Sequence, residues 1–313
     1  MGAVVIHESV LDWLMEGDPV IRWQTLRDLS NEAPEVWQAE RRQIVQTGWG
    51  AQFLENLRPD RTWPAGRWTD TLWTLLMLMD CGFPPDHPPV REAAKQFLEQ
   101  YLTPTRAGDP KWLVSRMDLC HLGFWLRMGA YFLGNDPWLG KIAETVFQLQ
   151  MPDGGWNCRK RIDPQTHHSS FHTTFNVLEG LSLLAERESG VASVFRQSEA
   201  RALEFMLCHQ LYRSDRTGEI IDERFTHLTF PSHWHYTVLR GLDYLRGCSQ
   251  ISDARLDDPL ALLVSRRKPN GRWPVERRIP GKTFFDMEKM GGDSRWNTLR
   301  ALRVLQCRQR ALA

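Results

Sequence analysis

The chain contains three residues whose side chains can bind transition metals. Asp118 and Cys120 are two positions apart, and His172 follows 52 positions after Cys120. A carboxylate, a thiolate and an imidazole form a mixed donor set that suits Zn²⁺, which prefers tetrahedral coordination. Three protein ligands leave a fourth position open, as in catalytic zinc sites, and His168 or Cys158 would close it. The sequence thus predicts a Zn²⁺ site. The alternative is a helix-capping carboxylate, a buried thiol and a hydrogen-bonded imidazole.

Three other titratable residues, Asp70, His121 and His235, stand close to the start of apolar helical segments, as Asp118 and His172 do. We expect catalytic roles for His121, His235 and Asp70, because an imidazole titrates near neutral pH and a carboxyl group can act as an acid or a base. For His235 the alternative is a contact with substrate or a hydrogen bond.

An internal repeat positions these residues. The segments Arg22–Leu29 and Arg295–Leu302 are identical at six of eight positions, and weaker copies surround Trp68, Asp118, His172 and Trp234. Each copy opens a segment whose apolar residues recur at three and four positions, which predicts helices buried on several sides. A more polar helical pattern follows most of them. Self-similarity at about 45–60 residues is typical of repeat architectures.

Between the repeats lie turns rich in Gly and Pro, such as Pro152–Trp156 and Pro269–Trp273. Six inner and about six outer helices predict an all-α protein, an (α/α)6 toroid of six helical hairpins in which residues 1–313 form a single domain. The Trp residues of the turns, Trp63, Trp156 and Trp273, are expected to fill gaps between hairpins.

In such a toroid the first turns of the inner helices meet at one mouth of a central cavity. Their positive ends favour an anionic ligand group, and aromatic rings suit a hydrophobic chain or a cation. Core packing is the alternative role for the rings. The residues predicted to bind substrate are Trp68, Trp125, Trp234, Trp296, Lys111, Arg116 and Arg295.

Two segments carry a family resemblance. Asp118–Trp125 resembles the D-x-C-Y-S-[FW]-W segment of protein prenyltransferase β subunits, and Phe171–Ser182 resembles their Y-H-T-x-Y-x-L-x-G-L-S segment. Gln148–Trp156 is similar to the repeat that those subunits share with terpenoid cyclases such as squalene cyclase. The resemblance implies that Asp118, Cys120 and His172 bind Zn²⁺ at the end of an aromatic cavity.

The predicted function is therefore that of a zinc-dependent enzyme, a prenyltransferase-like transferase or a cyclase, acting on a hydrophobic substrate such as an isoprenoid diphosphate. The basic residues that hold the diphosphate in the β subunits are replaced by Trp112 and Ser115, and no α-subunit partner is evident. Two alternatives remain: a carbohydrate-active enzyme with paired carboxylates from Asp70, Asp118 or Glu179, and a non-catalytic toroid that binds a lipid or a partner.

Composition narrows the function classes. The 313 residues hold 39 Lys and Arg against 38 Asp and Glu, interspersed along the chain, which argues against a nucleic-acid groove. The longest mainly apolar run, Leu72–Met79, is interrupted only by Thr74 and is too short for a membrane span. The N-terminal segment has no signal-peptide pattern, so we expect a cytoplasmic protein. The 6 Cys residues form no CxxC motif and predict no disulfide framework.

Overall fold

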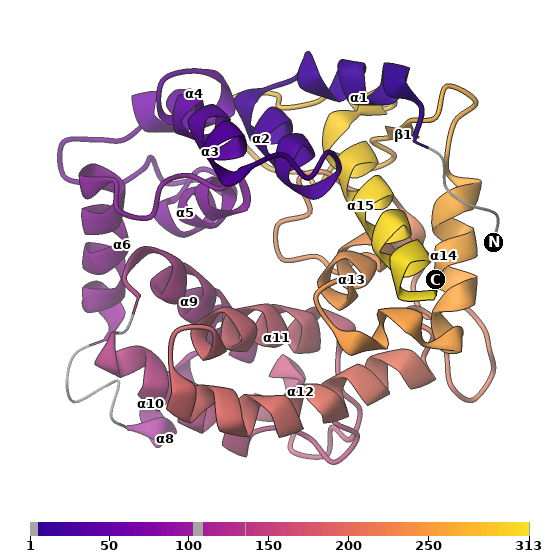
Figure 1. The fold of residues 1–313 in the computed structure, drawn as a ribbon. Helices are drawn as coiled ribbons and strands as arrows, with labels where there is room; N and C mark the ends of the chain where they lie inside the picture. Colours follow the sequence, from indigo (N-terminus) through magenta and orange to yellow (C-terminus); the bar gives the residue numbers. More distant parts are fainter. Residues whose placement is uncertain (1–5, 103–108, 135, 313) are drawn as a thin grey trace. The chain divides into compact units, whose positions relative to one another are not determined.

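The computed structural model describes residues 6–102, 109–134 and 136–312, and these are mostly helical (Figure 1). The prediction of an all-α protein is confirmed. Two short strands, β1 (Trp273–Pro274) and β2 (Asp293–Ser294), pair antiparallel with Trp273 opposite Ser294. The chain divides into two compact units: unit 1 holds Met1–Asn56, Cys81–Phe83 and Leu207–Ala313, and unit 2 holds Leu57–Asp80 and Pro84–Met206.

Unit 2 contains two kinds of helix. Its elements are α5 (Thr71–Asp80), α6 (Pro88–Tyr101), α8 (Pro110–Arg116), α9 (Leu119–Phe132), α10 (Pro137–Gln148), the 3₁₀ turn η2 (Cys158–Arg161), α11 (Phe171–Ala185) and most of α12 (Ser189–Cys208). In α5 every residue from Thr74 to Met79 is buried, as expected for an inner helix. Helix α10 instead buries one stripe at a spacing of three and four, including Leu139, Ile142 and Val146. The predicted alternation of fully and partly buried helices is present in this unit.

Helices α9 and α11 lie side by side and touch through their backbones (Figure 1). A Cβ atom at Gly123 would lie 2.5 Å from the carbonyl oxygen of Asn176, and one at Gly180 would lie 2.3 Å from the carbonyl oxygen of Gly123. Glycine is needed at both positions, because any side chain would separate the helices. The first turns of α9 and α11 therefore belong to one closely packed pair.

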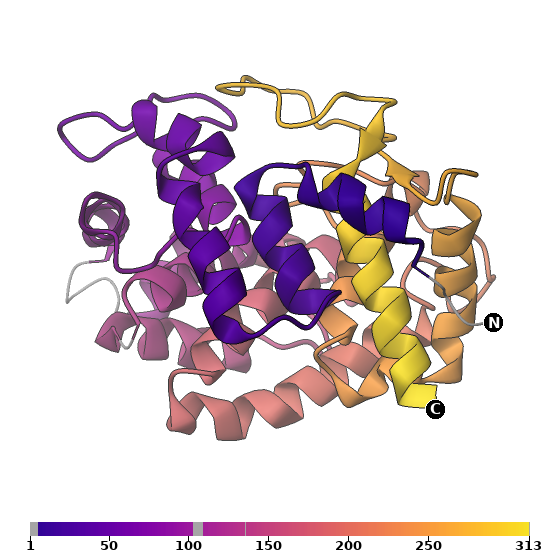
Figure 2. The same ribbon diagram turned by 45° about the horizontal axis from the view of Figure 1, so that its top comes forward.

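Unit 1 surrounds the long C-terminal helix. Its elements are α1 (Glu8–Met15), α2 (Pro19–Asp28), α3 (Pro34–Arg42), η1 (Gln43–Val45), α4 (Gly48–Glu55), η3 (Glu223–Thr226), α13 (Val238–Leu245), η4 (Ser249–Ser252), η5 (Ala254–Leu256), α14 (Asp257–Ser265), β1, β2 and α15 (Arg295–Leu312). Helix α15 packs on α2 and α13. The loop between β1 and β2 extends beyond the first turn of α15 (Figure 2), and its Phe285 packs on Phe53 of α4 with ring centroids 4.9 Å apart.

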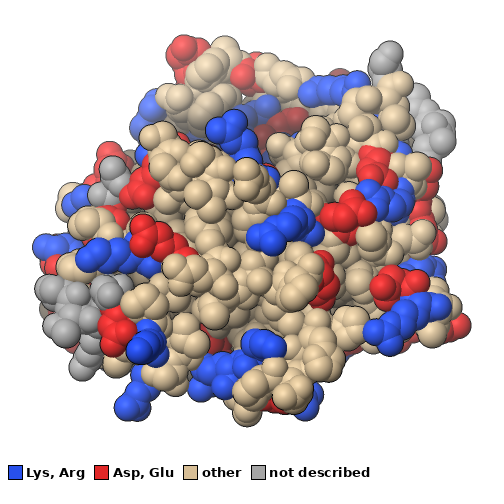
Figure 3. Space-filling model, turned by 90° about the horizontal axis from the view of Figure 1, so that it is seen from below, with Lys and Arg blue, Asp and Glu red and all other residues tan. Residues whose placement is uncertain are grey.

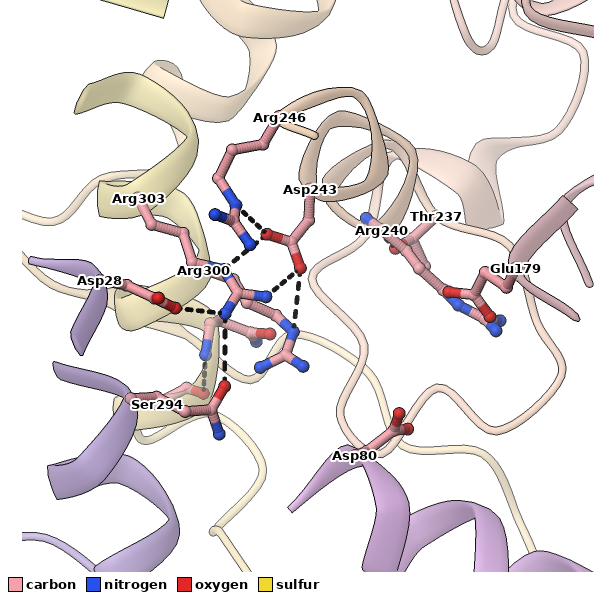
Figure 4. Close-up of polar contacts among 12 residues, drawn as sticks. Asp28, Asp80, Glu179, Thr237, Arg240, Asp243, Arg246, Ser294, Arg300 and Arg303 are labelled. Atoms are coloured by element: carbon pink, nitrogen blue, oxygen red, sulfur yellow. Dashed lines mark hydrogen bonds and ion pairs between the residues drawn. The ribbon is translucent and has the colours of Figure 1, made fainter. Parts of the chain in front are cut away.

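A buried ion network joins the inner helices of unit 1 (Figure 4). Arg303 of α15 donates from Nε to Asp243 of α13 at 2.6 Å and from Nη1 to Asp28 of α2 at 3.0 Å. Arg246 and Arg300 also pair with Asp243. Burial alone would raise the pKa of Asp243, but these cations, Arg303 foremost, lower it to about 2. The network fixes α2, α13 and α15 together, since a buried charge is costly without its partners.

Unit 2 has a corresponding link. Arg127 of α9 pairs with Asp80 of α5 at 2.6 Å and with Glu179 of α11 at 3.1 Å. An arginine thus joins three helices in each unit, Arg303 buried and Arg127 with 17% of its side chain exposed.

The turns that contain Trp156 and Trp273 are built by the same hydrogen bonds. The indole Nε1 donates to the carbonyl ten residues earlier, that of Val146 at 2.8 Å and that of Leu263 at 2.7 Å. The backbone N–H of each Trp donates 2.9 Å to a threonine Oγ1, of Thr174 or of Thr298, in the next helix.

Glycines with positive φ close both turns, Gly154 at φ 101° and Gly271 at φ 81°. Both Trp side chains are fully buried, and Trp63 is 2% exposed with its N–H on Thr71 Oγ1. Burial of all three agrees with the predicted packing role for the Trp residues of the turns.

The surface carries both signs of charge. On the face seen in Figure 3, Lys and Arg side chains are interspersed with Asp and Glu, and no large area of one sign stands out. None of the helices among the described residues is both long enough and apolar enough to span a bilayer.

Candidate functional site

The predicted metal ligands occupy the first turns of α9 and α11. Asp118 is the N-cap residue of α9 and Cys120 lies in its first turn. His172 lies in the first turn of α11, whose N-cap residue is Ser170. Since α9 and α11 are in backbone contact, the structure brings these two helix starts into one region of unit 2.

Cys120 lies against a second thiol, that of Cys158. The two sulfur atoms are 2.8 Å apart, and both cysteines are free thiols. Cys158 is the first residue of η2, the turn that follows Trp156. The backbone N–H of Cys120, in the first turn of α9, also donates to Cys158 Sγ at 3.3 Å. The site therefore contains a thiol pair at the N-terminal end of a helix.

Thr173 in the first turn of α11 connects the two cysteines. Its Oγ1 lies 3.5 Å from Cys120 Sγ and 3.4 Å from Cys158 Sγ, and it accepts the backbone N–H of Cys158 at 3.3 Å. Because these bonds come from α9, η2 and α11, all three elements contribute to the position of the pair.

The two thiols differ in acidity. The pKa of Cys158 is lowered to about 7, chiefly because its sulfur accepts a hydrogen bond from Cys120, with further bonds from Thr173 and the backbone. The pKa of Cys120 is raised, first because its thiol donates that bond and second because it is buried. Cys158 is therefore the more acidic thiol of the pair.

Asp118 faces a cation. Its Oδ1 accepts from Arg161 Nη2 at 3.0 Å, and the side chain is 40% exposed. Within the described ranges no group of three or more His, Cys, Asp or Glu side chains is arranged to hold a metal ion. The structure thus brings the predicted trio to adjoining turns without assembling it, and places Cys158 next to Cys120 instead. His168, the other suggested ligand, lies 3.9 Å from Asp153.

A row of aromatic rings adjoins the site. His121 contacts Phe124 edge-on at 5.9 Å, Phe124 contacts Trp73 at 5.0 Å, and Trp73 contacts Trp68 at 5.2 Å. Burial lowers the pKa of His121 despite the nearby Asp118 carboxylate, so its imidazole is neutral at pH 7. Trp68 is 5% exposed and belongs mainly to the core.

The other predicted aromatic contacts are packed against neighbours. Trp125 is 1% exposed and sits against Phe97 and Tyr101, with ring centroids 6.5 and 5.2 Å away. In unit 1, Trp296 stacks on Phe230 at 4.6 Å, and Trp234 stacks on His235 at 3.8 Å. Trp125 and Trp296 accordingly have mainly packing roles in the structure.

The predicted basic contacts have separate environments. Lys111 and Arg116 are exposed on α8. Arg295 donates from Nε to the carbonyl of Trp13 at 2.8 Å and covers the Trp13 ring, so it fixes α1 to the start of α15.

The remaining predicted catalytic groups are Asp70 and His235. Asp70 Oδ1 accepts the N–H of Trp73 at 3.1 Å at the start of α5, and burial raises its pKa. In unit 1, burial and neighbouring arginines lower the pKa of His235 to about 4, so this imidazole is neutral at pH 7.

Sequence reasoning considered Cys158 only as an additional ligand and did not include Thr173 or Arg161. A signal existed for Cys158, since it stands two residues after the Trp of a repeat turn. No signal in the sequence pairs Arg161 with Asp118, because they are 43 positions apart.

No family model matches the chain, and no curated protein or solved structure is significantly similar to it. The prenyltransferase resemblance therefore depends on the quoted sequence segments alone.

Proposed function

We propose that this chain is a zinc-dependent enzyme that acts on a hydrophobic substrate, with the first turns of α9 and α11 as its reaction centre. The single observation that carries the proposal is the thiol pair Cys120–Cys158 at these first turns, where the prenyltransferase-like segments meet. Soft thiolate ligands select Zn²⁺ over hard cations such as Mg²⁺.

The donors fit Zn²⁺ by type. Cys120 with its thiol neighbour would hold the ion, and His172 in the first turn of α11 is a further donor of suitable type. When bound, the ion supplies Lewis acidity that lowers the pKa of a coordinated thiol or water. Thr173 would orient the thiols through its hydroxyl.

The basic turn next to the thiols suits an anionic group on the substrate. Arg159, Lys160 and Arg161 follow Cys158 directly. Arg161 lies against Asp118, and Lys160 Nζ donates to the carbonyls of Pro164 and Thr166. An incoming diphosphate or carboxylate would compete for these cations and be neutralised by them. His121 and Trp73, the two partly exposed members of the aromatic row, would offer an apolar surface to a hydrocarbon chain.

The proposed architecture is an (α/α)6 toroid formed as a single domain. Support comes from within the units, where the turns at Trp156 and Trp273 repeat the same hydrogen bonds and an arginine joins three helices in each. Every repeat then contributes one hairpin to a closed ring.

No specific observation favours a carbohydrate-active enzyme. The carboxylates such an enzyme would use are engaged in structural contacts: Asp118 with Arg161, Glu179 with Arg127, and Asp70 with the start of α5.

The test combines elemental analysis of the purified protein with turnover of isoprenoid diphosphates and mass spectrometry of molecules that co-purify. We expect about one zinc per chain, a bound hydrophobic molecule, and loss of turnover in Cys120→Ala. Chelation that leaves stability unchanged in a zinc-free protein would contradict the proposal. Binding without turnover, unaffected by Cys120→Ala, would indicate a non-catalytic lipid-binding protein instead.

A further inference from the structure

The separation of the two sulfur atoms needs an explanation. At 2.8 Å Cys120 Sγ and Cys158 Sγ are closer than the roughly 3.5–4.0 Å at which non-bonded carbon atoms pack, although sulfur is larger than carbon. They are also farther apart than the ~2.05 Å of a disulfide. Two thiolates on one tetrahedral Zn²⁺, with Zn–S bonds of about 2.3 Å, would stand roughly 3.8 Å apart. A side-chain rotation that moves either sulfur atom by about 1 Å would make room for an ion between the two.

The surroundings of the pair resemble the support that proteins give to metal-bound thiolates. Cys158 Sγ receives the backbone N–H of Cys120 and faces the Thr173 hydroxyl. Hydrogen bonds of this kind orient ligands and offset the charge on sulfur. Both cysteines are shielded from solvent in part, which is expected of ligands rather than of solvent-exposed thiols.

The turn that carries Cys158 is held from several sides. Trp156, two residues earlier, is anchored to Thr174. Asn157 caps the turn by accepting the N–H of Arg159 at 2.9 Å, and it donates to the carbonyl of His168 at 2.7 Å. Cys158 N–H is bound to Thr173. The Cys158 side chain is thus positioned by backbone bonds that are independent of any ligand.

Asp118 has a different environment. Its carboxylate meets the Arg161 guanidinium, and the bond connects the cap of α9 to the last residue of η2. This ion pair holds the turn with Cys158 against the helix with Cys120. Asp118 in this position acts through Arg161, which engages its Oδ1 with both Nε and Nη2.

From this geometry we infer that Cys158 is a metal ligand, that Cys120 and Cys158 together form a dithiolate centre for a soft divalent ion of the Zn²⁺ class, and that Asp118 is a positioning residue. The inference deepens the proposed function at the same site, but it requires only metal binding and not turnover. Two thiolates neutralise the ion, so the centre favours Zn²⁺, Cd²⁺ and Co²⁺ over Mg²⁺ and Ca²⁺.

The first experiment uses the unmodified full-length chain, purified under reducing, oxygen-free conditions and loaded with Zn²⁺. X-ray absorption at the zinc edge counts sulfur neighbours directly. Two sulfurs per zinc support the inference. One sulfur, none, or no zinc binding overturns it, and this measurement does not depend on whether a variant folds.

The second experiment compares variants by Co²⁺ substitution, because sulfur-to-cobalt charge-transfer absorption scales with the number of thiolates. Cys158→Ser should lose about half of this absorption and bind Zn²⁺ at least tenfold more weakly. Asp118→Asn should keep the full absorption and lose affinity by about tenfold, the lower end of the range for residues outside the coordination sphere. Cys208→Ser, at an exposed cysteine of unit 1, is the control and should match the parent.

Opposite results would restore the arrangement implied by the family resemblance. If Asp118→Asn abolishes metal binding while Cys158→Ser keeps the parent absorption, Asp118 is the ligand and the inference is wrong. If zinc is bound by two sulfurs but no hydrophobic substrate is bound or turned over, the inference stands and the proposed enzymatic function fails. The two failures are therefore distinguishable.

Discussion

The turn at Trp156 in unit 2 and the turn at Trp273 in unit 1 share one framework and hold different side chains in it. In both, the indole and the backbone N–H of the Trp are bound to the helices before and after the turn. Two residues later the chains differ, with Cys158 in one turn and Val275, fully buried, in the other.

The helices that follow differ in the same way. Counting back from Thr174 and Thr298, Ser170 corresponds to Ser294 as the residue that accepts an N–H of the first turn. Thr173, which contacts both thiols, corresponds to Asn297, which donates to the carbonyl of Pro274 at 2.9 Å. The hydrogen bonds of the repeat framework pair its own backbone groups. The framework therefore accommodates either a thiol or an inert side chain at the same position of the turn. The thiol pair is thus a feature of one repeat turn and not of the shared framework.

The largest effect should come from removing the framework itself. Trp156→Ala and Trp273→Ala should each lower the free energy of unfolding by about 3–5 kcal/mol, because each deletes a fully buried indole and its hydrogen bond. Urea denaturation measures both. Equal losses would show that the frameworks are energetically alike, and a loss below about 1 kcal/mol in either would contradict the shared packing role.

Low pH should lower the free energy of unfolding by protonating Asp243 of unit 1. Its folded-state pKa of about 2 lies below the ordinary value of 3.8, so ionised Asp243 contributes stability on the order of 2 kcal/mol at neutral pH. This contribution is complete above about pH 4 and is lost as the pH falls through 2. Unfolding free energy measured between pH 5 and 2 should fall less steeply in Asp243→Asn than in the parent. Parallel slopes would show that Asp243 is not responsible.

The threonines that bind the turns should matter somewhat less. Thr174→Val and Thr298→Val keep the side-chain shape but leave the buried N–H of Trp156 or Trp273 without its acceptor, at a cost of about 2 kcal/mol. Calorimetric unfolding should show similar losses for both. A clearly greater loss at Thr174 would mean that the thiol site adds stability to its turn.

The smallest effects are expected at the caps, where the two turns should diverge. Ser294 Oγ accepts from Asn297 at 2.9 Å and also donates to Glu288, whereas Ser170 Oγ accepts from Thr173 at 3.5 Å. Ser294→Ala should cost about 1 kcal/mol and Ser170→Ala about half as much. The reverse order in thermal unfolding would indicate that Ser170 supports the cysteine site in a way that the bond lengths do not reveal.

The all-α class and the turns could be predicted from the sequence because their causes are local. Apolar spacing marks buried helices, and Gly154 and Trp156 mark a turn. Cys120 and His172 were placed at helix starts for the same reason. The partners at those starts depend on contacts distant in sequence: the ion pair of Asp118 with Arg161, the packing of Trp125 on Tyr101, and the bond from Arg295 to the carbonyl of Trp13. Composition and periodicity do not encode which of several neighbours a long side chain reaches.

The glycine contact between α9 and α11 has a consequence for the rigidity of the proposed site. Gly123 lies three residues beyond Cys120, and its carbonyl oxygen would meet any Cβ at Gly180. The width between the helices next to the thiols is consequently set by peptide groups, which are stiffer than side chains and have no alternative rotamers. In the proposed site, any adjustment to a bound ion would therefore fall to the turn η2, which carries Cys158, and not to the spacing of the two helices.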